Sequence, residues 1–77
     1  MNLTNRHQQC LEALSVLGPS TAREVANYLH DKGYTKMIER NIAHPRLNEL
    51  ENGGYVESIG TKWDEFTERD VTVYQII

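Results

Sequence analysis

The sequence predicts one small α+β domain of three helices followed by a two-stranded β-hairpin. Three observations lead to this fold class. Apolar residues recur at helical spacing in three segments, glycine ends each segment, and the apolar period changes to two after Gly54. A chain of 77 residues has too little surface to bury two independent cores. We therefore expect a single domain spanning residues 1–77.

The first two helices have clear start and stop signals. The first begins after Thr4, a residue type favoured at the N-cap, and ends at Gly18. Its apolar residues share one helical face, and they are Cys10, Leu11, Leu14 and Leu17. The second begins at a capping box formed by Thr21 and Glu24 and ends near Gly33. Its apolar residues are Ala22, Val25, Ala26 and Leu29.

The third helix follows a segment, residues 32–40, that has no clear period and that we expect to be a turn or an irregular helix. Its buried face is predicted to carry Ala43, Leu47 and Leu50, and residues 52–54 supply the left-handed end. Proline is disfavoured inside a helix, so we expect Pro45 in the first turn, with Asn41 as the cap.

Strand character returns after the glycines. Residues 55–59 and 71–77 alternate apolar and polar side chains, whereas residues 60–70 are polar, which predicts a hairpin with a long tip. Two basic and four acidic side chains give this tip a net charge of −2. It also carries Trp63 and Phe66, which we expect to fold back on the domain, with contact to a protein partner as the alternative.

Composition excludes several classes of protein. The net charge of −3 argues against an indiscriminate polyanion binder, and the chain has no apolar run of membrane length. No leader-like segment is present, so we expect a cytoplasmic protein of a bacterium or of a phage-infected host cell. His7 and Cys10 are too few for a metal site, and we expect a solvated His7 and a buried Cys10. With no catalytic motif, we expect neither enzyme activity nor a cofactor.

Positive charge is concentrated before and within the third helix. Residues 36–46 have a net charge of +2, whereas the rest of the chain sums to −5. If Ala43, Leu47 and Leu50 face the core, the step of 100° per residue turns the opposite side of the helix to solvent. That outward side carries Asn41, Pro45, Asn48 and Asn52, with His44 and Arg46 on its flanks.

The order of elements and three segments of sequence carry a resemblance. Residues 18–26 (GPSTAREVA), 45–50 (PRLNEL) and 54–56 (GYV) resemble the winged helix-turn-helix DNA-binding domains of small bacterial and phage regulators. Residues 67–71 look like the return strand of the wing in that family. The resemblance implies a winged helix in which the third helix enters the major groove and the two-stranded hairpin is the wing.

The resemblance implies double-stranded DNA as the partner and transcription regulation as the role. The candidate DNA-binding residues are Lys36, Arg40, Asn41, His44, Arg46, Asn48 and Lys62. Lys36 and Arg40 are suited to phosphate contacts, whereas asparagine can pair with adenine and arginine with guanine. Simpler roles stay open: Asn41 as a cap, Asn48 as a surface amide, and Arg46 as a partner of Glu49.

A second hypothesis is a winged-helix adaptor that binds a protein, for example a phage protein that binds a host protein, and does not bind DNA. The acidic total charge and the pair Trp63 and Phe66 favour it. Under the DNA hypothesis we also expect a homodimer. Its interface is predicted at the first helix or at residues 71–77, taken as an apolar edge strand.

Overall fold

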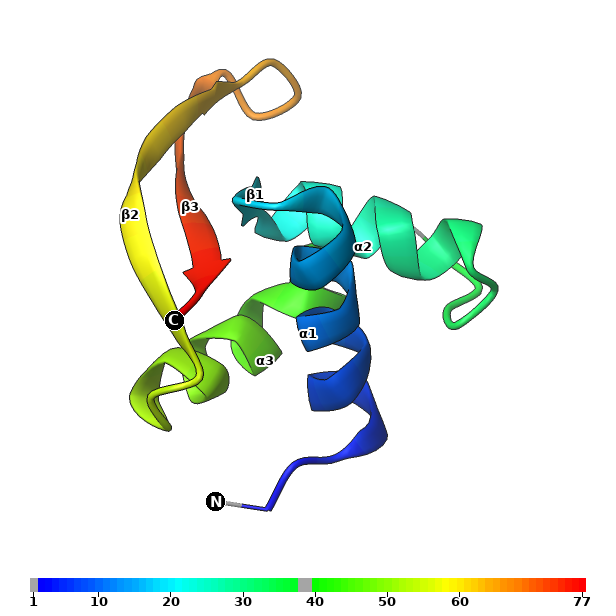
Figure 1. Cartoon of the computed structure of the whole chain (residues 1–77). Coiled ribbons are helices and arrows are strands. Elements are labelled where there is room, and N and C mark those ends of the chain that lie inside the picture. The colour runs from blue at the N-terminus through cyan, green and yellow to red at the C-terminus, as the bar shows by residue number, and fades with distance from the viewer. Residues whose placement is uncertain (1, 38–39) are drawn as a thin grey trace.

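The computed structural model describes residues 2–37 and 40–77 and confirms the α+β class. The elements of this part of the chain are α1 (Asn5–Leu17), β1 (Ser20–Thr21), α2 (Ala22–Asp31), α3 (Arg40–Asn52), β2 (Val56–Asp64) and β3 (Arg69–Ile76). The strands form an antiparallel sheet in the order β1-β3-β2. The hairpin of β2 and β3 stands beside the helices (Figure 1). None of the described helices has the length and apolarity to cross a membrane.

The apolar faces of the helices meet in one core, which the base of the hairpin closes. Leu29, Leu47 and Leu50 are fully buried, and each contributes roughly 1.5–3 kcal/mol through the apolar surface that it removes from water. The other buried apolar residues are Cys10, Ala13, Leu14, Ala22, Val25, Ala26, Ala43, Val56 and Tyr74. Leu17, predicted on the same face of α1, is 47% exposed because α1 ends there.

Both N-terminal helices begin with a capping box. At α2, the backbone N–H of Glu24 donates to Thr21 Oγ1 at 3.2 Å, and the Thr21 N–H donates to Glu24 Oε1 at 2.9 Å. At α1, the confirmed cap Thr4 has an unexpected partner, because its N–H donates to His7 Nδ1 at 3.0 Å. Thr21 also pairs with Val73, so the start of α2 is fixed to the sheet.

The start of α3 differs from the prediction, whereas its end agrees with it. The helix begins at Arg40, so Asn41 is not the cap and Pro45 lies inside the helix. Proline leaves the carbonyl of Asn41 without its helical donor, and this costs little because Asn41 is exposed and water can replace the donor. Gly54, with φ of +82°, ends the helix, and the Tyr55 N–H donates to the carbonyl of Leu50. The predicted turn at residues 32–37 is found, and residues 38–39 lie outside the described part of the chain.

The hairpin is longer than predicted, with only residues 65–68 between its strands. Residues 60–64 pair in register with residues 69–73, so the prediction of a long polar tip was wrong. Backbone pairing continues there without an apolar alternation because this outer part of the hairpin reaches solvent. A β-bulge at Ile59, between Ser58 and Gly60, interrupts the alternation, and Gly60 has a φ of +146° that favours glycine.

Strand β3 is the central strand of the sheet. The predicted dimer interface at residues 71–77 required an edge strand there, and that expectation was wrong. Strand β3 pairs with β2 on one side and with β1 on the other. Strand β1 was not predicted, because two residues are too few to show a strand pattern. The outer strands are β1 and β2, and β2 is the longer of these two edges.

We expect Thr21→Ala to lower the free energy of unfolding by about 1 kcal/mol, because it removes the acceptor at the start of α2. Urea denaturation measures this change. Thr21→Ser keeps the hydroxyl and is the matched control, with a smaller expected loss. Equal losses in the two variants would show that the methyl group, and not the cap, stabilises this site.

Candidate nucleic-acid interface

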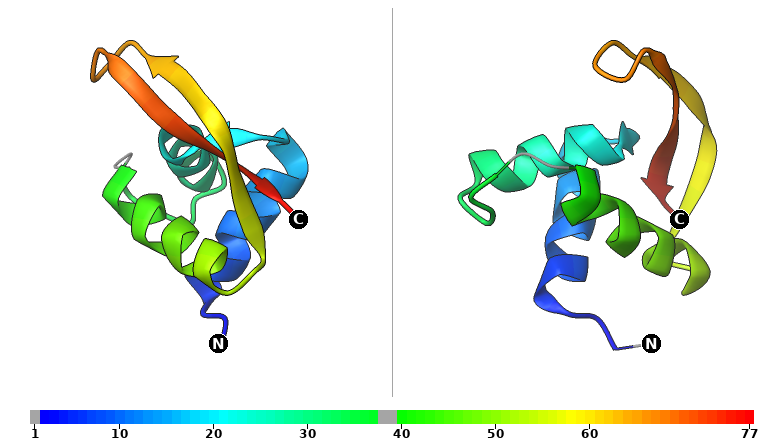
Figure 2. Two further views of the ribbon diagram at one scale, coloured as in Figure 1. Left: turned by 90° about the vertical axis from the view of Figure 1, so that its left-hand side faces the viewer. Right: turned by 180° about the vertical axis from the view of Figure 1, so that it is seen from behind.

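The outward face of α3 is polar and open, as the helical step predicts. Asn41, Pro45, Asn48 and Asn52 are exposed, and His44 and Arg46 are half-buried on opposite flanks. The helix and the hairpin diverge from the turn at residues 53–55 and extend toward the same side of the molecule (Figure 2, left).

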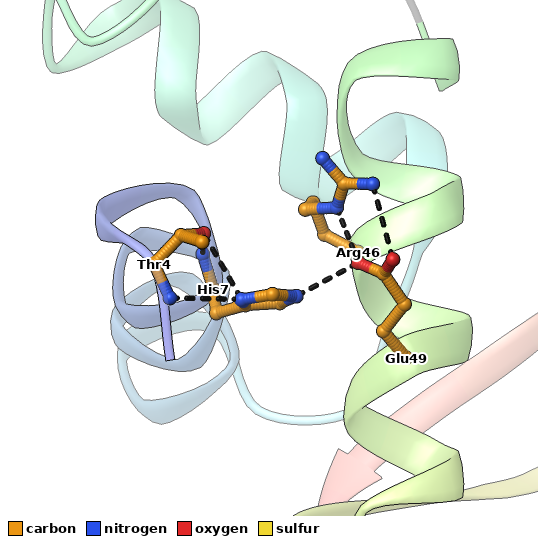
Figure 3. A network of polar contacts seen from close by, with 4 residues as sticks. All are labelled: Thr4, His7, Arg46 and Glu49. Atoms are coloured by element: carbon orange, nitrogen blue, oxygen red, sulfur yellow. Dashed lines mark hydrogen bonds and ion pairs between the residues drawn. The ribbon is translucent and has the colours of Figure 1, made fainter. Parts of the chain in front are cut away.

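Arg46 is held by a network that joins α3 to α1 (Figure 3). Its Nε and Nη2 donate to the two carboxylate oxygens of Glu49 at 2.5 and 3.2 Å, which confirms the local pairing that the sequence left open. His7 Nε2 donates to Glu49 Oε1 at 2.8 Å, since Nδ1 already accepts from Thr4. These bonds, first that of His7 and then those of Arg46, lower the pKa of Glu49.

His7 was therefore wrongly expected to be solvated, because it is only 5% exposed and bridges two helices. Its sequence position, three residues after a cap, is where a capping-box acceptor belongs, and this signal could have indicated its role. The Glu49 side chain, 45% exposed, balances the charge of Arg46. Arg46 thus lies on the flank of the outward face of α3 with two nitrogens of its guanidinium already bonded to Glu49.

Asn48 and His44 face the sheet side of the outward surface. The hydroxyl of Tyr74, on β3, donates to Asn48 Oδ1 at 3.1 Å. His44 lines a cavity of about 250 Å³ between α3, the N-terminus of α2 and the hairpin, together with Arg69, Thr72 and Tyr74 among others. One flank of α3, through His44, therefore meets the hairpin in a polar hollow.

The outer part of the hairpin is tied to α2 by two ion pairs. Lys62 Nζ lies 2.6 Å from Glu24 Oε2, and Arg23 Nε lies 3.4 Å from Asp64 Oδ2. The Lys62 side chain is 56% exposed, so its ammonium can be reached from solvent. A phosphate that binds Lys62 has to compete with the carboxylate of Glu24.

Trp63 and Phe66 do not fold back on the domain as expected, since they are 57% and 82% exposed. Paired strands carry the tip past the buried core to the outer surface of α2, so neither ring is buried. One contact is made: the Arg23 guanidinium lies 4.6 Å from the centroid of the Phe66 ring. Phe66 also lines a hollow against α2 with Arg23, Asn27 and Asp31.

Lys36 and Arg40 precede and open α3, respectively. Lys36 is exposed in the turn at residues 32–37, and Arg40 opens α3. A carboxylate fixes this turn to α1: Glu12 accepts from the hydroxyl of Tyr28 at 2.6 Å and from that of Tyr34 at 3.0 Å. Nothing in the sequence indicated this clamp, because its members lie 16 and 22 residues apart.

A metal centre is not built by the described residues, among which His, Cys, Asp and Glu form no group of three or more suited to a metal. Cys10 is buried, and burial raises the pKa of its thiol to about 11. A protonated thiol is a poor metal ligand, so the arrangement of Cys10 fits a core residue.

One solved structure has a similar fold over the whole of this chain. It is the crystal structure of the Vibrio cholerae ferric uptake regulator (Fur), with a TM-score of 0.73, 20% sequence identity, and coverage of 100% of this chain and 54% of the regulator chain. That structure reveals a rearrangement of the regulator's DNA-binding domains. This chain thus spans about half the length of the regulator. Searches against family models and curated proteins gave no match. The likeness shows that the fold is a winged helix.

The Glu12 clamp makes stability depend on acid pH. The hydrogen bond from Tyr28, its largest cause, lowers the pKa of Glu12 below the ordinary 4.5, and Tyr34 and Lys32 add to the effect. A carboxyl with a lowered folded-state pKa stabilises the fold above its unfolded pKa, and this contribution is lost as the pH falls through the folded-state value.

We therefore expect the free energy of unfolding to fall with pH below about 4.5, and to fall less steeply in Glu12→Gln. Urea denaturation at a series of pH values measures both slopes. Glu57→Gln is the control, since Glu57 is exposed on β2 and, within the described part of the chain, its one side-chain bond is to the uncharged Gln75. Identical slopes in wild type and Glu12→Gln would refute the role of the clamp.

Proposed function

We propose that this chain binds double-stranded DNA sequence-specifically, as a transcriptional regulator of a phage or a bacterium that acts in the cytoplasm. One observation carries the proposal: the open polar face of α3, with cationic residues at its start, lies beside the hairpin of a winged helix. In this arrangement α3 enters the major groove and the hairpin approaches the backbone. The Fur structure, whose DNA-binding domains share this fold, supports the same use.

The proposed contacts divide by chemistry. Lys36 and Arg40 bind phosphates, because they precede or open the helix that enters the groove. Asn41, His44 and Asn48 reach base edges from the outward face and its flank. The two remaining candidates, Arg46 and Lys62, contribute less because each is already paired with a glutamate.

The acidic net charge is compatible with this proposal, since it does not describe the interface. Glu24, Glu49 and Asp64 are each paired with a cation of the chain. Paired carboxylates repel a phosphate less than free ones do, so these three oppose DNA binding less than the net charge of −3 suggests. A homodimer is part of the proposal, because specific sites commonly consist of two half-sites.

The test is an NMR titration of the labelled protein with a generic duplex at about 50 mM salt, repeated at about 150 mM. Amide signals from residues 36 to 48 should shift at low salt and return toward their free positions at high salt. Phosphate contacts release counterions, which gives this salt dependence. Absence of shifts in this segment at low salt would refute DNA binding through α3.

Two lysines provide a matched comparison of phosphate contacts. We expect Lys36→Ala to weaken DNA binding at all sequences and to reduce the slope of log K against log salt by about 0.9. Lys62→Ala should change the slope less, because Glu24 already holds the Lys62 ammonium. Fluorescence anisotropy across a salt series measures both slopes. An unchanged slope in Lys36→Ala would remove Lys36 from the interface.

A second candidate function, protein binding by the wing, is favoured by the exposure of Trp63 and Phe66. Glu65, Glu68 and Asp70 are exposed neighbours of these rings in the sequence, so the fitting partner presents an apolar side chain flanked by lysine or arginine. Isothermal titration with a basic peptide that contains one tryptophan tests this surface. Binding should be lost in Phe66→Ala and kept in Val16→Ala, a control that truncates an exposed apolar residue on α1. Equal binding by both variants would exclude the tip.

A further inference from the structure

The contact between Tyr74 and Asn48 joins a buried strand to the open face of α3. Tyr74 lies on the central strand and is 3% exposed, whereas Asn48 is exposed on α3. The Tyr74 hydroxyl donates to Asn48 Oδ1 at 3.1 Å, over a separation of 26 residues. A buried tyrosine hydroxyl keeps a hydrogen-bond partner, so this contact restricts the rotation of the asparagine amide.

With its oxygen bonded to Tyr74, the Asn48 amide turns its nitrogen away from the sheet. Its oxygen and nitrogen branch from Cγ in different directions within one plane, so an oxygen turned toward β3 leaves Nδ2 turned away from the sheet. A bidentate pair with adenine needs both atoms on the same base edge, the oxygen to accept from N6 and the nitrogen to donate to N7. The Tyr74 hydroxyl holds the Asn48 oxygen on the side of β3, so the amide presents its N–H donors, and not its acceptor, on the outward side.

We propose that Tyr74 is a positioning residue that makes Asn48 a donor-only reader of the major groove. The base that suits such a reader is guanine, whose N7 and O6 both accept hydrogen bonds. The inference rests on the proposed DNA binding and names a base preference for one position of the site. It also gives Tyr74 a role at the interface in addition to its place in the core.

A first experiment examines the contact without DNA. The two side-chain amide protons of Asn48 give separate NMR signals, and their positions should change in Tyr74→Phe, which keeps the ring and removes the hydroxyl. Tyr34→Phe is the matched control, since its hydroxyl bonds Glu12 on α1. Unchanged Asn48 signals in Tyr74→Phe would overturn the proposal.

A second experiment reads the base preference. Selection from a library of random duplexes should give the wild type and Tyr34→Phe a site with guanine at one position. In Tyr74→Phe the released amide can pair with adenine, so the adenine-to-guanine ratio at that position should rise about tenfold. Asn48→Asp keeps an acceptor for Tyr74 but has no donor, and it should select cytosine, whose N4 donates.

The outcomes separate the two proposals. If the wild type selects a site and both Tyr74→Phe and Asn48→Asp select the same one, DNA binding stands and the positioning role of Tyr74 is overturned. If the wild type binds no duplex at low salt, the proposed function fails and the inference fails with it. Asn48→Asp changes an exposed residue, so it reports on base reading even if Tyr74→Phe does not fold.

Discussion

Burial of one face of α3 is the constraint on which the presentation of its other residues depends. Ala43, Leu47 and Leu50 have no exposed surface, and they fix the rotation of the helix about its axis. A helix with this rotation has to turn Asn41 and Asn48 outward. The direction in which the polar face of α3 points is therefore set by the apolar contacts on the opposite face of the same helix.

Polar contacts at the edge of the core then connect α3 and the turn before it to α1. Glu49 joins Arg46 to His7 across α1 and α3, and Glu12 joins the turn before α3 to α1 through tyrosine hydroxyls. Both carboxylates lie at the margins of the core, where a hydrogen bond to a charged group is stronger than in open water. The start and the flank of α3 are thereby connected to the same supporting helix.

Local patterns in the sequence predicted the parts of the fold that local rules determine. The cap at Thr21, the buried face of α2 and the glycine end of α3 follow from spacing and residue type, and the structure confirms them. The strand β1 and the outer hairpin escaped prediction because two residues show no period and a bulge breaks one. The outward face of α3 was predicted, but the contacts that hold its side chains to other elements were not. No spacing rule could bring Tyr74 to Asn48 or His7 to Glu49, since those pairs form only when distant elements pack.

The bulge at Ile59 has a consequence for how this domain can change over evolution. A bulge bends its strand, and this one lies between the base of the hairpin, where Val56 and Tyr74 are buried, and the outer part, where Lys62 meets Glu24. The bulge thus separates the base of the hairpin, which packs in the core, from the outer part, which does not. Lengthening or removing the bulge would change the direction of the outer part of the hairpin and leave the buried contacts of its base in place. The outer part of the hairpin can thus change direction toward a new target while the domain keeps its buried core.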